Sequence, residues 1–206
     1  WEATFEDSLY LINFLIDDDK IFLPGLTRPF DNGNLSVLVQ LEDLGNNYSV
    51  TSAQKYDLSV QREASRGLIK LDNPTTPYAM LQHKGWISID DTQIALLNPD
   101  GEIVEIKNYN LADDQIWNGP VNDLDNSIAI FGEEANDTNE GFVISSQHDL
   151  TSYEAYSFFG VGYIRDIGVD FDRRQRMLVS NGAVTLVDEN YSILQSLTTV
   201  NVTLNR

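Results

Sequence analysis

The chain has 206 residues and a formal net charge of −19 at pH 7. That charge excludes proteins that wrap nucleic acid and polybasic membrane anchors, because both need a basic face against phosphate groups. The chain has no cysteine and only two histidines, which excludes disulfide frameworks, thiol nucleophiles and three-histidine metal centres. Hydrophobic residues make up 42% of it, so we expect one packed domain spanning residues 1–206.

The N-terminal segment is compatible with two structures. The chain begins with Trp1 instead of Met, as expected if an N-terminal segment has been removed. Its longest apolar run, Leu9–Ile16, is far shorter than the roughly 20 residues that cross a bilayer, so we expect no membrane insertion. This run fits a helix capped by Thr4 as well as it fits an alternating strand. Strand-like runs follow at Lys20–Pro24 and Leu35–Leu41.

Three pairs of apolar, β-branched runs predict hairpins. The paired runs are 93–97 with 102–106, 127–131 with 142–145, and 176–180 with 183–187. Asn98–Gly101 joins the first pair, with a proline that presets φ and a glycine for a left-handed position. A polar loop over Gly132–Gly141 is expected in the second. Asn181 and Gly182 join the third, and this dipeptide favours the type I′ turn, in which both central residues have positive φ.

These patterns predict an all-β, antiparallel chain. Four strand-like runs fall between Ile164 and Val200, and four short strands in about 40 residues is the size of one propeller blade. A β-sandwich or jelly roll gives similar short strands, and the uneven spacing of the hairpins favours it. We therefore keep both irregular β-propeller-like blades and a sandwich. Lys55–Arg66 and Asp149–Phe159 are candidate helical turns, and residues 72–77 are the one plausible domain boundary.

No catalytic constellation is recognisable. The chain lacks the Gly-x-Ser-x-Gly pattern of a nucleophile elbow. His148 is next to Asp149, but adjacent residues on a strand point to opposite faces, so this adjacency is no triad. The many carboxylates could include a glycoside hydrolase pair, yet nothing in the sequence marks two of them as buried. We expect a protein that is not an enzyme.

Calcium is the one metal ion that the acidic turns suit. Ca²⁺ prefers oxygen ligands, and two short turns supply several carboxylates. These candidate metal ligands are Asp123, Asp125, Asp170 and Asp172. None of them lies in the twelve-residue calcium loop that ends in a bidentate glutamate. Aspartate is also common in turns because its side chain bonds its own backbone, which is the alternative explanation.

Aromatic residues cluster at one place. Tyr153, Tyr156 and Tyr163 fall within eleven residues, and Trp117 lies beside a separate turn. Such side chains stack on sugar rings or anchor protein interfaces, so these four are candidate ligand-binding residues. The alternative is that they pack at the edge of a hydrophobic core.

Basic residues also cluster once. Arg173, Arg174 and Arg176 stand within four positions of an otherwise acidic chain. They are candidate interface residues for an acidic partner, including another copy of the protein. The alternative is an edge strand that its charges protect from pairing.

Five Asn-x-Ser/Thr sequons are candidate glycosylation sites, at Asn34, Asn47, Asn136, Asn190 and Asn201. With the acidic charge and the polar turns, they suggest an extracellular, cell-surface or virion module. We expect a structural or adhesion role through contact with protein, namely other subunits of an assembly. A lectin-like domain that binds glycans is the alternative, ahead of a carboxylate-dependent glycoside hydrolase. The final run, 198–204, could close the chain's own sheet or add to that of a neighbouring subunit.

Overall fold

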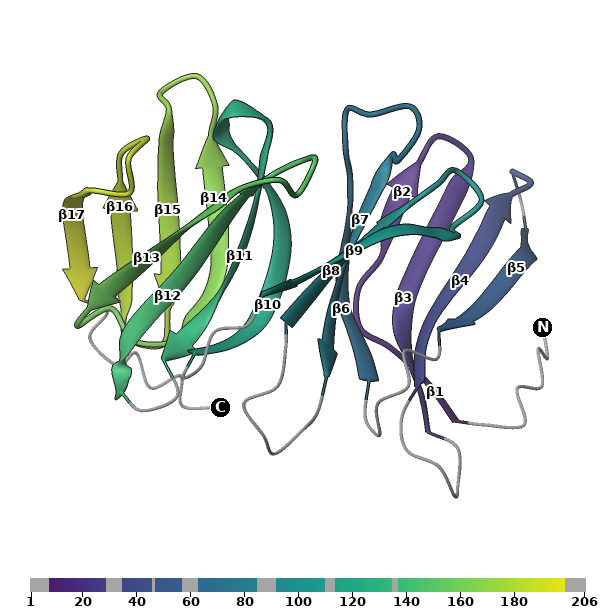
Figure 1. Ribbon diagram of the computed structural model, residues 1–206, viewed down its shortest axis with the longest axis horizontal. Helices are drawn as coiled ribbons and strands as arrows, with labels where there is room; N and C mark the ends of the chain where they lie inside the picture. The colour runs from purple at the N-terminus through teal and green to yellow at the C-terminus, as the bar shows by residue number, and fades with distance from the viewer. Residues whose placement is uncertain are drawn as a thin grey trace. The chain divides into compact units, whose positions relative to one another are not determined.

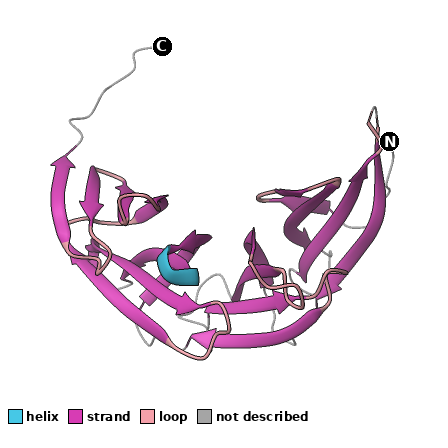
Figure 2. Ribbon diagram, turned by 90° about the horizontal axis from the view of Figure 1, so that it is seen from above, coloured by secondary structure: helices cyan, strands magenta, loops and turns pink. Residues whose placement is uncertain are grey.

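The computed structural model describes residues 8–28, 35–45, 47–56, 63–84, 92–109, 114–134 and 137–198. The chain divides into two compact units, unit 1 (Trp1–Leu111) and unit 2 (Ala112–Arg206). Antiparallel strands dominate both, and a single 3₁₀ turn, η1 (Leu124–Asn126), interrupts them in the described part of the chain (Figure 2). The all-β prediction is confirmed. Among these residues no helix has the length and apolar character to cross a membrane.

Unit 1 consists of two antiparallel sheets (Figure 1). In the first, blade 1, the order is β1-β3-β4-β5, and β2 pairs with the other end of β3, so β1 and β2 together form its first strand. The second, blade 2, has the order β6-β7-β8-β9. The strands are β1 (Ser8–Leu11), β2 (Leu15–Asp17), β3 (Lys20–Arg28), β4 (Leu35–Asp43), β5 (Tyr48–Tyr56), β6 (Glu63–Lys70), β7 (Tyr78–Lys84), β8 (Thr92–Leu97) and β9 (Ile103–Tyr109).

Unit 2 repeats this plan. Blade 3 has the order β10-β11-β12-β13 and blade 4 the order β14-β15-β16-β17. The strands are β10 (Asp114–Asp123), β11 (Ser127–Glu134), β12 (Asp137–Gln147), β13 (Tyr153–Phe159), β14 (Ile164–Asp170), β15 (Gln175–Ser180), β16 (Ala183–Val187) and β17 (Ile193–Thr198). Each sheet pairs strands that follow one another in sequence, which is the construction of a propeller blade. The fold is therefore propeller-like.

All three predicted hairpins are confirmed. Gly101 has the expected positive φ of 83° between β8 and β9. The turn at Asn181 and Gly182 joins β15 to β16, but neither residue has a positive φ, so the predicted type I′ turn is wrong. The Ser180 hydroxyl accepts the backbone N–H of Ala183 at 3.2 Å and so helps to close the turn in another conformation. The second hairpin differs from the prediction, because its strands continue into the expected loop and pair Glu133 with Gly141. Ladder hydrogen bonds come from the backbone, so polar residues extend a strand wherever a partner strand lies alongside.

The helical alternatives are wrong wherever the structure describes them. Residues 153–159 form β13, and the first apolar run divides into β1 and β2. Residues 55–56 and 63–66 belong to β5 and β6, and the positions between them lie outside the described residues. Ladder pairing to neighbouring strands outweighs the weak local preference for a helix. Residues 72–77 form the turn between β6 and β7, within one sheet.

Each unit has a hydrophobic core between its two blades. In unit 1, Phe22 and Leu38 of blade 1 pack with Leu68 and Met80 of blade 2. In unit 2, Phe131 of blade 3 packs with blade 4 side chains such as Leu178. Each blade thus buries one face against its neighbour, and the side chains at these two junctions bring distant parts of the chain together.

Candidate functional site

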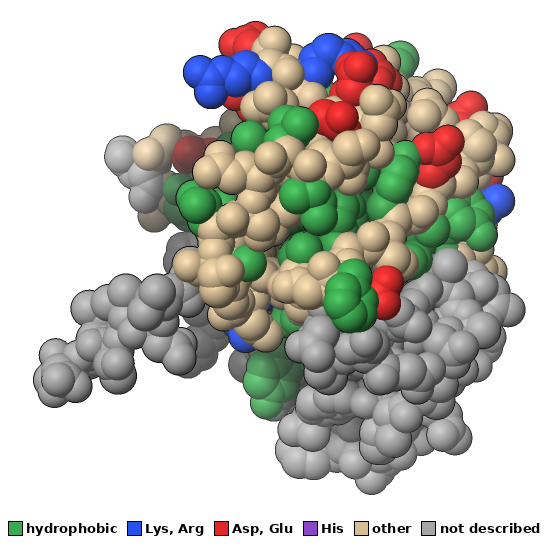
Figure 3. All heavy atoms as spheres, turned by 90° about the vertical axis from the view of Figure 1, so that its left-hand side faces the viewer, with side chains coloured by type: hydrophobic (Ala, Val, Ile, Leu, Met, Phe, Trp, Pro, Cys, Tyr) green, Lys and Arg blue, Asp and Glu red, His purple; other side chains and the backbone are tan. Residues whose placement is uncertain are grey.

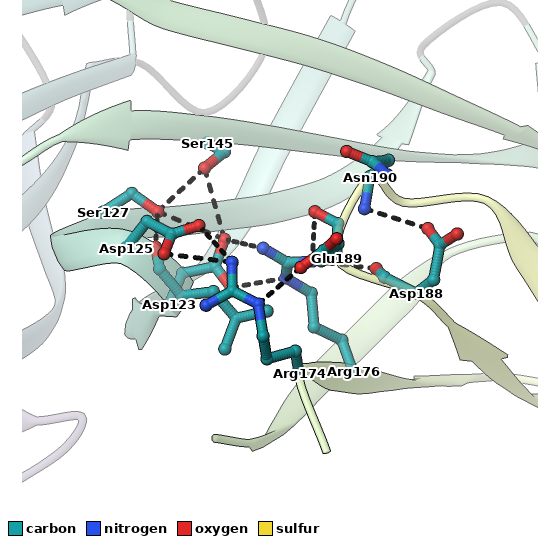
Figure 4. Close-up of polar contacts among 10 residues, drawn as sticks. Asp123, Asp125, Ser127, Ser145, Arg174, Arg176, Asp188, Glu189 and Asn190 are labelled. Carbon is teal, nitrogen blue, oxygen red and sulfur yellow. Dashed lines mark hydrogen bonds and ion pairs between the residues drawn. The ribbon is translucent and has the colours of Figure 1, made fainter. Parts of the chain in front are cut away.

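A buried ion pair joins blade 3 to blade 4 (Figure 4). Asp123 is the last residue of β10 and Arg176 is the second residue of β15, and they are 2% and 3% exposed. Arg176 Nε donates to Asp123 Oδ1, and Arg176 Nη2 donates to Oδ2 at 3.1 Å. This two-point contact matches the planar fork of a guanidinium to the two oxygens of a carboxylate.

The rest of the Arg176 guanidinium is also occupied. Nη1 donates to the backbone oxygens of Asp188 at 2.9 Å and of Glu189 at 3.0 Å, in the turn between β16 and β17. The ring of Tyr191, from the same turn, has its centroid 3.9 Å from the guanidinium carbon. A cation over an aromatic face gains electrostatic energy from the ring, so Tyr191 stabilises the charge that Asp123 neutralises.

Hydroxyl groups complete the shell around Asp123. Tyr191 donates its hydroxyl to Oδ2 at 2.7 Å and Ser145 donates to the same oxygen at 3.2 Å. Burial raises the pKa of Tyr191 well above its ordinary value, and the nearby charge of Asp123 raises it further. The hydroxyl of Tyr191 therefore keeps its proton. Both carboxylate oxygens of Asp123 thus have partners within the chain. The cluster can hold two blades together, and it presents no bare carboxylate to a substrate.

An exposed ion pair lies beside this cluster. Arg174 Nη2 donates to both Asp125 oxygens, at 2.8 and 3.1 Å, and its Nε pairs with Glu189. Hydrogen bonds from Arg174 lower the pKa of Asp125. Asp125 and Arg174 both have positive φ, at 56° and 51°, so each lies in a tight turn that aims its side chain at the other blade. Solvent screens this pair, so it contributes less than the buried one.

Unit 1 has a junction of the same design. Asp17, the last residue of β2, accepts the hydroxyl of Tyr78 at 2.8 Å and forms an ion pair with Lys70, both from blade 2. Burial alone would raise the pKa of Asp17. The hydrogen bonds from Lys70 and Tyr78 outweigh that effect and hold the pKa below its usual 3.8. Both units therefore join their blades through an aspartate at the end of a first strand, a cation and a tyrosine hydroxyl.

In both units the fourth strand of the first blade also contacts the second blade. In unit 1, Tyr56 of β5 donates its hydroxyl to the backbone oxygen of Gly101 at 2.6 Å, in the turn between β8 and β9. In unit 2, the ring of Tyr156 of β13 stacks on Tyr191, with centroids 4.3 Å apart. In each case a tyrosine of one blade's fourth strand contacts the turn between the third and fourth strands of the next.

The structure separates the candidate ligand-binding aromatics. Tyr153 and Tyr156 are three positions apart on β13, so they point to opposite faces of the sheet. Tyr163 accepts a hydrogen bond from Asn118 Nδ2 at 2.8 Å. The side chain of Trp117 lies outside the described residues. No single described face collects these tyrosines, and their binding of a ligand stays a prediction.

The candidate metal and interface residues have partners inside the chain. Asp123 and Asp125 are paired with arginines, and Asp170 Oδ1 accepts the backbone N–H of Arg173 at 3.0 Å. Asp172 is exposed in the turn before β15. Within the described ranges, no group of three or more His, Asp or Glu side chains is placed to hold a metal ion. Calcium binding stays a prediction, as does an intermolecular role for the arginines.

Two of the five sequons lie in described parts of the chain. Asn47 is exposed at the start of β5, and Asn190 is exposed in the turn between β16 and β17. Asn34, Asn136 and Asn201 lie outside the described residues. Exposure is necessary for glycosylation but does not demonstrate it.

No sequence pattern predicted the roles of Tyr191, Lys70 and Ser145. Each contacts an aspartate that is distant along the chain. Tyr191 follows the turn residues Asp188 and Glu189, and a large aromatic directly after an acidic turn was the available signal.

Apolar side chains are exposed on the outward side of blade 4. We call this surface the end face of blade 4, and it comprises Asp170, Met177, Val179, Val184, Leu186 and Leu197. The register places Met177 beside Leu186 and places Val184 beside Leu197, all pointing away from blade 3. Met177 is 46% exposed and Leu197 is 59% exposed. Figure 3 views the side on which β17 lies and shows hydrophobic side chains gathered there.

Blade 1 has a comparable apolar face on the side away from blade 2. This end face of blade 1 comprises Leu11, Ile16, Ile21, Leu23 and Val50, as the register of β1 to β5 shows. A groove of about 360 Å³ lies along it. Phe14 and Ile16, both exposed, are among the residues that line the groove.

Comparison with known proteins shows similarity of fold. No protein-family model matches the chain, and no curated protein matches it. Among solved structures, the crystal structure of Sqt1 from Chaetomium thermophilum is similar, with a TM-score of 0.54 and 12% sequence identity. The match covers 93% of this chain and 48% of that one, so the chain spans about half the length of Sqt1. At this identity the likeness concerns the fold alone.

Proposed function

We propose that the chain is a non-catalytic module that acts by protein–protein contact through the apolar end faces of its blades. The end face of blade 4 carries this proposal, because Met177 and Leu197 expose about half of their surface on a sheet whose other face is a hydrophobic core. Soluble proteins rarely leave a contiguous apolar surface in water unless another molecule covers it.

The junction chemistry supports a role without catalysis. A general acid or base must reach the substrate to transfer a proton. Asp123, a buried acid between blades 3 and 4, is instead bonded to Arg176 and Tyr191. Such a saturated cluster fixes two blades rigidly, which favours a scaffold that presents a surface.

An extracellular or surface location belongs to the same proposal. The net charge of −19 keeps such a module soluble and suppresses non-specific association. The exposure of Asn47 and Asn190 agrees with a glycosylated surface. Mass spectrometry of the protein from its natural source, before and after deglycosylation, tests this part. An unmodified Asn47 and Asn190 would contradict it.

Site-specific photo-cross-linking tests the contact surface. A photoreactive phenylalanine analogue replaces Met177 in one variant and replaces Ser152, exposed on blade 3, in the control. We expect the analogue at position 177 to form adducts with protein. An excess of unlabelled wild-type protein should compete these adducts away, and an excess of the unlabelled Met177→Glu variant should not. Adducts of equal yield from both positions, or none from position 177, would contradict the proposal.

A further inference from the structure

Three aspartates occupy the same position in their blades. Asp17, Asp123 and Asp170 each end the first strand of a blade, next to the turn that leads to its second strand. Asp17 and Asp123 point to the following blade, which supplies a cation and a tyrosine hydroxyl. Asp170 points from the end face of blade 4, accepts the backbone N–H of Arg173 in its own turn and is about half exposed.

The end face of blade 4 has the design of a surface that receives another blade. Blade 1 covers the core of unit 1 with apolar side chains such as Phe22 and Leu38, with Asp17 at the hairpin end. The end face of blade 4 likewise places Met177 and Leu197 beside a terminal aspartate. Removal of such apolar side chains from water is favourable, so covering this face would stabilise a contact with another molecule.

The end face of blade 1 is its counterpart. It lies on the side from which a preceding blade would approach, because blade 2 covers the opposite side. It is apolar, and the groove beside Ile16 and Phe14 gives it a recess for a protruding side chain. One chain therefore carries two different apolar blade faces, one on blade 4 and one on blade 1.

We propose that the end face of blade 4 binds the end face of blade 1 of a second copy of this chain. This inference rests on the proposed function and names the partner of the same surface. The contact is head-to-tail, so each copy uses a different face and an assembly can contain more than two copies.

Charge gives the proposed contact a measurable signature. Each copy carries a net charge of −19, so two copies repel one another while their apolar faces attract. Salt screens the repulsion, since the Debye length falls from about 14 Å at 0.05 M to about 4 Å at 0.5 M, and it leaves apolar burial in place. Association should therefore strengthen as the salt concentration rises, the opposite of an assembly held by ion pairs.

Light scattering after size exclusion tests the inference on the whole chain. We expect the wild-type mass to exceed 23.2 kDa and to rise with protein and salt concentration. Leu197→Glu alters one face and Ile16→Glu alters the other, and each should reduce the mass to that of one chain. Val104→Glu, at a position 58% exposed on blade 2, is the matched control and should assemble like the wild type.

Mixing the two variants decides the geometry. The Leu197→Glu chain keeps an intact blade 1 face and the Ile16→Glu chain keeps an intact blade 4 face, so their mixture should form a pair of one copy each. Circular dichroism of every variant confirms that the β-structure is retained. A wild-type monomer at all salt concentrations, or assembly by Ile16→Glu alone, overturns the inference. Cross-linking from position 177 to a different protein would overturn it and leave the proposed function standing.

Discussion

Tyr78 and Tyr191 donate their hydroxyls to aspartates in equivalent positions, at 2.8 and 2.7 Å, although they come from different parts of their blades. Tyr78 is the first residue of a second strand, and Tyr191 lies in the turn before a fourth strand. At both junctions the aspartate at the end of a first strand thus contacts a hydroxyl and a cation of the following blade. The following blade supplies the hydroxyl and the cation from different positions in the two units.

Replacing Asp123 by Asn should destabilise the protein strongly. Asparagine has nearly the same shape but no charge, so Arg176 would remain buried without a counter-ion. Breaking a buried ion pair in this way costs about 3–5 kcal/mol. Urea unfolding followed by fluorescence measures the loss. Asp125→Asn, which removes an exposed pair with Arg174, is the control and should destabilise the protein far less, because solvent screens that pair. Equal losses would contradict a special role for Asp123.

Removing only the hydroxyl of Tyr191 should have a smaller effect. Tyr191→Phe loses the hydrogen bond to Asp123 and keeps the ring beneath Arg176 and against Tyr156. Asp123 Oδ2 keeps its hydrogen bonds from Arg176 and Ser145, so the loss is that of one hydrogen bond to a charged group, about 1.5–3 kcal/mol in unfolding free energy. Tyr191→Leu also loses both ring contacts and should cost at least about 1 kcal/mol more. If the two variants were equally stable, the ring contacts would contribute nothing.

Acid should weaken the blade 1–blade 2 junction through Asp17. Its pKa is lower in the folded protein than its usual 3.8, so folding favours the carboxylate. That stabilisation is complete above pH 3.8 and is lost as the pH falls through the folded-state value. The difference in unfolding free energy between the wild type and Asp17→Asn should therefore be constant from about pH 5 to 8 and shrink below about pH 4. A difference that stays constant down to about pH 2 would show that Asp17 is not ionised preferentially in the fold.

Gly25 should not tolerate a side chain. A Cβ atom there would lie 2.2 Å from the backbone oxygen of Tyr10, on the adjacent strand β1. Gly25→Ala must therefore push β1 away from β3, and we expect a loss of about 2 kcal/mol or more, as for other overpacked sites. Gly182→Ala is the matched control, because a Cβ at position 182 meets no atom within 4 Å. Hydrogen exchange of the β1 amides should increase in the first variant only.

Local patterns determined most of the fold. The turn residues Asn181 and Gly182 predicted the β15–β16 hairpin because this dipeptide favours tight turns, although neither residue adopts the positive φ of the expected type I′ turn. Alternation of apolar residues predicted the strands on either side of it. The loop expected after residue 131 was too long, because the sequence around Glu133 is polar and says nothing about the strand that lies beside it.

The site was predicted only in part, and for a physical reason. The sequence singled out Arg176 and Asp123 by their charge and by their position in turns, as an interface residue and as a metal ligand. It could not show that they bind each other, since they are 53 positions apart and lie in different sheets. Hairpins are set by interactions within a few residues of the chain. The ion pair, the hydroxyl of Tyr191 and the two exposed end faces exist only once whole blades pack face to face, and that packing was decided by the tertiary structure.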